Sequence, residues 1–160
     1  MNNYTVLFVD DELSNLNTFK RLFRKEQLDI FTADSGQQGL ELLAKNPIDL
    51  VISDMRMPYM NGAIFLQEVK KLYPHTKRII MSGYSDIEAI EDTINKGGIC
   101  KFIKKPWNND ELKTAIRNLI NLNDYEAPCN IRQLENIIDR QQMEIDSLIM
   151  NRLYEEEAKN

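Results

Sequence analysis

The sequence of 160 residues has few cysteines and no long apolar run, and these absences exclude several classes of protein. Its two cysteines, Cys100 and Cys129, are too few for a disulfide framework or a cysteine-rich metal site, so we expect two free thiols in a reducing compartment. The N-terminus has no basic region followed by an apolar segment, and no run approaches transmembrane length. The sequence therefore predicts a cytoplasmic protein that does not associate with a membrane.

The net charge of -5 gives no overall attraction to the phosphates of nucleic acids or to anionic lipids. From Asp124 onward the chain has nine acidic and four basic residues, so the preceding part is near neutral. We therefore expect no direct binding to nucleic acid.

Short apolar runs rich in β-branched residues alternate five times with segments of helical period. The predicted strands are 5–9, 28–32, 50–53, 78–81 and 100–103. The apolar stripes that mark the helices are Leu16, Phe19 and Phe23; Leu40, Leu43 and Ala44; Phe65, Leu66, Val69 and Leu72; Ile87, Ile90 and Ile94; and Leu112, Ala115, Ile116, Leu119 and Ile120. This alternation predicts an α/β fold, a doubly wound parallel sheet of five strands flanked by five helices. We expect the order 2-1-3-4-5, in which the first and third strands are neighbours.

The pattern breaks after residue 122. We predict one domain over 1–122, a linker over 123–130 and an amphipathic C-terminal helical extension over 131–160.

In this extension, apolar residues recur with a seven-residue period that is typical of a short coiled-coil seam. The seam consists of Ile131, Leu134, Ile138, Gln141, Ile145 and Leu148. Arg152 occupies the next core position and interrupts it. The pattern slightly favours self-association through this seam, and the alternatives are a solvated connector helix or a helix packed on its own domain.

Reactive or charged side chains follow four of the five predicted strands. Asp10 and Asp11 follow the first, Asp54 the third, Ser82 the fourth and Lys105 the fifth. In an open parallel sheet, sites lie beyond the carboxyl ends of the strands where the winding direction reverses. Three carboxylates meeting there would repel one another, and Mg²⁺, which prefers oxygen ligands, would relieve this repulsion. The pattern therefore predicts a magnesium site.

Asp54 is the candidate nucleophile, because a carboxylate beside Mg²⁺ can attack a phosphoryl group and form an aspartyl phosphate. The Ser82 hydroxyl and the Lys105 ammonium could donate hydrogen bonds to phosphoryl oxygens. Each residue also has an ordinary alternative role: Asp10 or Asp11 could cap the first helix, Ser82 could close a turn and Lys105 could be a solvated loop residue. Their convergence at one sheet edge favours the site.

Over about residues 4–122 the sequence resembles the receiver domains of response regulators. The matching motifs are Val-Asp-Asp-Glu at 9–12, Asp-Met-Arg-Met-Pro at 54–58 with Gly62 after it, Met-Ser-Gly-Tyr at 81–84 and Lys-Lys-Pro-Trp at 104–107. The resemblance implies that Asp11, Asp54 and the backbone carbonyl of Arg56 coordinate Mg²⁺, while Asp10 assists through water.

The resemblance further implies that Ser82 and Lys105, rather than Lys104, contact the phosphoryl group. It implies a cis bond between Lys105 and Pro106, in keeping with the general restriction of cis peptides to X-Pro. Phe102 stands at the family's aromatic switch position, where the ring turns inward as Ser82 moves toward the phosphate. Ordinary core packing is the alternative role for Phe102.

The function implied is a phosphorylation switch and not an enzyme with an external substrate. A sensor histidine kinase would phosphorylate Asp54, and the face formed by the fourth helix, fifth strand and fifth helix would pass the change through 131–160, in a homodimer, to an effector outside this chain.

Three other readings remain. The adjacency of Asp10 and Asp11 counts against a phosphatase of the haloacid dehalogenase type, whose motif spaces two aspartates by one residue. A flavodoxin-like cofactor binder is also disfavoured, because the acidic residues after the first strand would repel the phosphate of its cofactor. A pseudo-receiver that only binds partners usually lacks acidic or lysine positions that are all present here.

Overall fold

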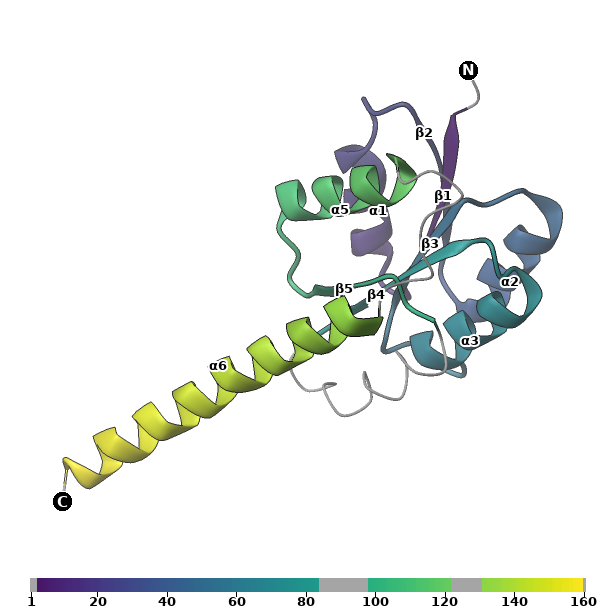
Figure 1. Ribbon diagram of the computed structural model, residues 1–160. Helices are drawn as coiled ribbons and strands as arrows, with labels where there is room; N and C mark the ends of the chain where they lie inside the picture. The colour runs from purple at the N-terminus through teal and green to yellow at the C-terminus, as the bar shows by residue number, and fades with distance from the viewer. Residues whose placement is uncertain (1–2, 84–97, 122–130, 160) are drawn as a thin grey trace.

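The structure, a computed structural model, describes residues 3–83, 98–121 and 131–159. Five strands form one sheet in the order β2-β1-β3-β4-β5, and each neighbouring pair is parallel (Figure 1). They are β1 (Tyr4–Val9), β2 (Leu28–Ala33), β3 (Leu50–Asp54), β4 (Lys77–Ser82) and β5 (Lys101–Lys104). The predicted α/β fold class and strand order are confirmed.

Helices cover both faces of the sheet, with α2 and α3 on one side and α1 and α5 on the other (Figure 1). The described helices are α1 (Leu13–Leu22), α2 (Gly36–Lys45), α3 (Gly62–Leu72), α5 (Asn109–Asn121) and α6 (Ile131–Glu157). The helix expected from Ile87, Ile90 and Ile94 and the linker over 123–130 lie outside the described residues.

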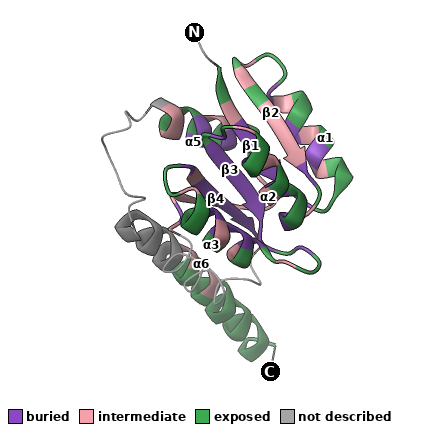
Figure 2. Ribbon diagram, turned by 90° about the vertical axis from the view of Figure 1, so that its right-hand side faces the viewer, coloured by how far each residue is buried: buried purple, intermediate pink, exposed green. Residues whose placement is uncertain are grey.

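The sheet separates two apolar clusters, because successive side chains of a strand point to opposite faces. In β1, Leu7 and Val9 pack in the cluster under α2 and α3, whereas Val6 and Phe8 pack in the cluster under α1 and α5. All four are fully buried, which explains why β1, an inner strand, is a continuous apolar run (Figure 2). The sheet is therefore a rigid platform for the loops at its carboxyl edge.

Helix α6 is one continuous helix of 27 residues that starts beside β5 and then runs away from the sheet (Figure 1). Of the predicted seam, Gln141 and Ile145 are half-buried and Leu148 is exposed. The remaining seam side chains lie outside the described ones: Ile131, Leu134 and Ile138. Among the described residues, no helix combines the length and apolarity needed to cross a bilayer.

The expectation of two free thiols is wrong for Cys100, which is disulfide-bonded. Whether a cysteine is bonded depends on how closely another cysteine approaches it in space, and separation along the chain does not reveal this. Cys129 lies outside the described residues. The expectation of a reducing compartment therefore loses the support of the thiols.

Candidate functional site

Three acidic side chains meet at the carboxyl edge of the sheet. Asp10 directly follows β1 and Asp54 ends β3, and the parallel register places Val9 opposite Ser53, so the two carboxylates are neighbours. One carboxylate oxygen from each of Asp10, Asp11 and Asp54 lies within 4.8 Å of the other two. Asp10 and Asp54 are buried, whereas Asp11 is exposed. The structure thus brings together the three acids that the sequence predicts to converge.

Lys105 joins this cluster from the loop after β5. Its Nζ lies 2.9 Å from Asp10 Oδ2 and 3.0 Å from Asp54 Oδ1, so one ammonium bridges the two buried carboxylates. Its backbone N–H donates to the carbonyl oxygen of Ser82 at 2.9 Å, which fixes the loop against the end of β4. The Lys105–Pro106 peptide bond is cis. Lys105 is therefore held at the site by both its side chain and its backbone.

Asp10 also fastens the start of α1. Its Oδ1 accepts the backbone N–H of Glu12 at 2.9 Å, and its Oδ2 accepts the side-chain amide of Asn15 at 3.0 Å. Asp10 is therefore not the cap of α1, whose N-cap is Glu12 without a side-chain cap, but it holds Glu12 and Asn15 in place while it belongs to the acidic cluster. Asn15 was not singled out from the sequence, because a polar residue in a first helical turn has no distinctive signal.

Burial raises the pKa of the Asp54 carboxyl above its usual value; the contact with Lys105 opposes this rise and the charges of Asp10 and Asp11 add to it. Burial acts to lower the pKa of the Lys105 ammonium, but its contacts with Asp10 and Asp54 outweigh burial, and the pKa is raised. Lys105 therefore stays protonated, and it lies beside Asp54, whose ionised form is destabilised by burial.

Ser82 lies on β4, which is next to β3, and Phe102 lies on β5, the edge strand beyond it. Ser82 is the last residue of β4, one position beyond Met81, the residue paired with Asp54. The Ser82 hydroxyl is buried and makes a long contact of 3.3 Å with the carbonyl oxygen of Gly83. Phe102 is buried in β5 among residues of the α2 and α3 cluster. The aromatic ring is therefore packed inward in this structure.

The loop between β3 and α3 closes tightly over the site. The Met55 N–H donates to the Met81 carbonyl and the Gly62 N–H donates to the Met55 carbonyl, at 2.9 and 2.8 Å. A Cβ at Gly62 would collide with the backbone carbonyl oxygen of Asp54, so only glycine permits this approach. Sequence reasoning noted Gly62 only as part of a motif.

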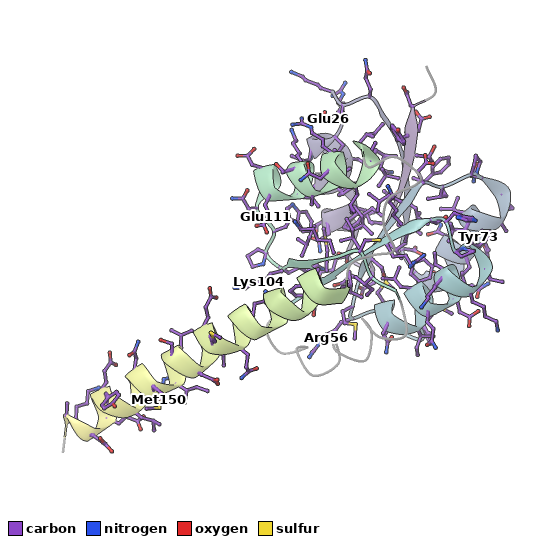
Figure 3. All side chains as sticks on the ribbon, in the orientation of Figure 1. Glu26, Arg56, Tyr73, Lys104, Glu111 and Met150 are labelled. Atoms are coloured by element: carbon purple, nitrogen blue, oxygen red, sulfur yellow. The ribbon has the colours of Figure 1, made fainter. Side chains whose placement is uncertain are left out.

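The outer part of the same loop is open to solvent. Arg56 is exposed, and its side chain borders a shallow hollow of about 450 Å³ lined by Met55, Met57, Pro58 and Asn61 (Figure 3). Tyr59 is fully exposed and has a φ of 68°, the left-handed region that non-glycine residues rarely adopt.

The donor set suits a hard divalent cation. With three carboxylates against one ammonium the cluster is formally negative, and carboxylate oxygens are ligands that Mg²⁺ prefers. Asp11 is exposed, and the buried Asp54 side chain keeps 10% of its surface exposed to solvent. The site can therefore attract a cation and present a carboxylate to an incoming group.

Comparisons with known proteins agree on one family. The profile of the response regulator receiver domain matches residues 6–117. Hydrogenase transcriptional regulatory protein HoxA of Cupriavidus necator is 34% identical over 131 residues, 82% of this chain. Sporulation initiation phosphotransferase F of Bacillus subtilis is 31% identical over 122 residues, covering 76% of this chain and 98% of that protein.

Solved structures give the same result. The signal receiver domain of an HD domain-containing protein from Pseudomonas fluorescens has a TM-score of 0.72 and 33% identity, covering 74% of this chain and 94% of that one. The chain spans only 27% and 24% of the length of the HoxA proteins of Cupriavidus necator and Bradyrhizobium diazoefficiens.

Proposed function

The chain belongs to the response regulator receiver domain family, and we propose that it is a phosphorylation switch in which Asp54 accepts a phosphoryl group from a sensor histidine kinase. The observation that carries this proposal is the meeting of Asp10, Asp11 and Asp54 with Lys105 at one edge of the sheet. Receiver membership supports signalling by phosphorylation, and this cluster supplies the groups for the chemistry.

In the proposed step, a carboxylate oxygen of Asp54 attacks the phosphorus of a phosphohistidine. The new O–P bond forms as the P–N bond breaks, and the imidazole nitrogen leaves with the electron pair. Hydrolysis of the acyl phosphate later restores the carboxylate and releases inorganic phosphate. The protein would catalyse only its own phosphoryl transfer and dephosphorylation.

Lys105 and Ser82 would contact the transferred group. The Lys105 ammonium already lies 3.0 Å from Asp54 Oδ1, so a small rotation would let it pair with a phosphoryl oxygen. The Ser82 hydroxyl donates a long hydrogen bond of 3.3 Å to the Gly83 carbonyl, and a charged phosphoryl oxygen would be a stronger acceptor. Phe102 would move with Ser82 as the aromatic partner of the switch.

We assign the Mg²⁺ site to Asp10, Asp11, Asp54 and the backbone carbonyl of Arg56, with Asp10 acting through water. When bound there, the ion would offset the charge that develops on the transferred oxygens. The convergence of the three carboxylates, with oxygens within 4.8 Å of one another and Asp11 exposed, supports this assignment. Asp10 already accepts three hydrogen bonds, from Glu12, Asn15 and Lys105, which suits an indirect role.

The change would pass through the face that contains β5 and α5 to α6, and α6 would carry it to an effector in a homodimer. The position of α6 beside β5 supports this route. HoxA is named as a transcriptional regulator and the receiver from Pseudomonas fluorescens comes from an HD domain-containing protein, so the effector stays unspecified. The cytoplasmic location remains a prediction.

The decisive test is covalent phosphorylation of the whole chain. The protein is incubated with Mg²⁺ and acetyl phosphate, weighed intact, and compared with Asp54→Asn. Asp49→Asn is the matched control, because Asp49 is an exposed acid just before the same strand. One phosphoryl adduct that is lost in Asp54→Asn and retained in Asp49→Asn supports the proposal. No adduct on any of the three proteins would favour a pseudo-receiver that binds partners without phosphorylation.

A further inference from the structure

The carboxylate of Asp10 is fully buried and accepts hydrogen bonds at both of its oxygens. Its Oδ1 accepts the backbone N–H of Glu12 at 2.9 Å, and its Oδ2 accepts the side-chain amide of Asn15 at 3.0 Å and the ammonium of Lys105 at 2.9 Å. Glu12 and Asn15 belong to the start of α1, whereas Lys105 comes from the loop after β5. Asp10 is therefore held at both oxygens by one helix terminus, and through Oδ2 it also binds a separate element.

Asn15 and Lys105 donate to the same carboxylate oxygen, so the two side chains affect each other. A carboxylate oxygen has two lone pairs, and these two donors fill the acceptor capacity of Oδ2. Because both donor groups are positively polarised, each reduces the electrostatic gain of the other while both are in place. The amide of Asn15 therefore stabilises Asp10 less while Lys105 is bound and more once Lys105 has moved away.

The contact between Lys105 and Asp10 is the one that the proposed phosphoryl transfer would loosen. The Nζ of Lys105 lies 2.9 Å from Asp10 and 3.0 Å from Asp54, and the phosphoryl group would be attached to Asp54. An ammonium that follows the new charge would thus leave Asp10. Removing one partner of a buried ion pair is strongly unfavourable, because a buried charge is left uncompensated. The cost of the movement therefore depends on which donors stay at Asp10.

We propose that Asn15 is a positioning residue for phosphoryl transfer, whose amide holds the Asp10 carboxylate in place while Lys105 moves to the phosphoryl group. Asn15 is half-buried in the first turn of α1, and this helix begins only three residues after β1. Its amide can therefore stay at Asp10 when the loop after β5 shifts. This role rests on the proposed function, because it exists only if a phosphoryl group displaces Lys105.

A structural role, in which Asn15 only supports the start of α1, makes a different prediction. It would change the stability of the protein without a selective effect on the phosphoryl-bound state. In the positioning role, the amide matters most when Lys105 has left Asp10. Loss of the amide should therefore weaken binding of a phosphoryl group far more than binding of Mg²⁺ alone.

The test compares, on the full chain, the binding of Mg²⁺ with the Mg²⁺-dependent binding of beryllofluoride, a stable mimic of a phosphoryl group. Both are followed by the fluorescence of Trp107, the single tryptophan, which lies two residues after Lys105 and contacts Phe8 edge-on at 6.0 Å. Asn15→Leu replaces the amide with an apolar group of the same branching, and Asn15→Gln keeps an amide. Asn17→Leu is the matched control, because Asn17 is an exposed asparagine of the same helix.

Asn15→Leu should weaken beryllofluoride binding by at least about tenfold, equivalent to about 1.4 kcal/mol, and should change the affinity for Mg²⁺ by less than about threefold. Asn15→Gln should recover most of the loss, and Asn17→Leu should match wild type in both measurements. Circular dichroism checks the fold of each variant, and Asn15→Ala repeats the comparison if leucine disturbs it.

Two outcomes would overturn the positioning role of Asn15. One is wild-type affinity for beryllofluoride in a folded variant that lacks the amide. The other is an equal loss of affinity for Mg²⁺ and for beryllofluoride, which would mean that Asn15 acts on the ion and not on the movement of Lys105. Failure of the wild-type protein to bind beryllofluoride in the presence of Mg²⁺ would instead overturn the proposed function itself.

Discussion

Replacing Lys105 with methionine removes the only described ammonium between the buried Asp10 and Asp54 carboxylates while keeping a similar side-chain volume. We expect the free energy of unfolding at neutral pH, without Mg²⁺, to fall by about 3 to 5 kcal/mol, the range found when one partner of a buried ion pair is removed. At separations of about 3 Å and an effective dielectric constant of about 20, each contact is worth about 5 kcal/mol before desolvation is subtracted. The lost attraction therefore exceeds the desolvation cost that is removed together with the ammonium.

The raised pKa values of Asp54 and Lys105 determine how the stability loss of Lys105→Met changes with pH. The pKa of Asp54 is raised in the folded state, so its protonation favours folding, and this contribution is lost as the pH rises through the raised pKa. The deficit of Lys105→Met should therefore shrink as the pH falls toward the acidic range. The pKa of Lys105 is also raised, so its stabilisation is complete below the ordinary lysine value and is lost above the raised one. Only the wild-type protein should show this alkaline loss.

Urea denaturation across pH, with and without Mg²⁺, measures both effects. Lys113→Met is the control, because Lys113 pairs with Glu26 at 3.6 Å on the surface and should contribute at most about 1 kcal/mol. Added Mg²⁺ should recover stability in Lys105→Met, since a ligand that binds only the folded state stabilises it. Equal stability of Lys105→Met and wild type at neutral pH, or a deficit that does not change with pH, would contradict the electrostatic account.

Two further substitutions test the loop between β3 and α3. Tyr59→Gly should raise the free energy of unfolding by about 1 kcal/mol in urea denaturation, because it relieves a left-handed φ of 68° and removes no buried contact. An unchanged or lower stability would show that Tyr59 is not strained. Gly62→Ala should lower the stability by about 1 to 3 kcal/mol and slow phosphorylation by acetyl phosphate, because its Cβ meets the carbonyl of Asp54. Normal phosphorylation of a destabilised Gly62→Ala protein would separate the packing of this loop from the chemistry.

The arrangement of the strands and the position of the site could be predicted from the sequence. The alternation of strands and helices predicted a parallel sheet, and the expected order 2-1-3-4-5 implies that Asp10 and Asp54 leave adjacent strands at one edge. The same rule places Lys105 at this edge, because Lys105 directly follows β5. These predictions succeed because a parallel sheet brings the carboxyl ends of its strands together whatever the details of the loops.

Features that depend on loop geometry could not be predicted from the periodicity of the sequence. The amide of Asn15 on Asp10, the collision that excludes a side chain at Gly62 and the left-handed backbone of Tyr59 all arise from local contacts that leave no periodic signal. The bonded state of Cys100 was predicted wrongly for the same reason.

The proposed relay from Asp54 to α6 has a short physical route. Lys105 must release at least one of its two carboxylates to pair with a phosphoryl oxygen, and its backbone N–H is bonded to Ser82 at the end of β4. A shift of Lys105 therefore acts on the ends of β4 and β5 together, and β5 lies beside the start of α6. If phosphorylation tightens the proposed homodimer by some factor, thermodynamic linkage requires that dimerisation favour the phosphorylated state by the same factor.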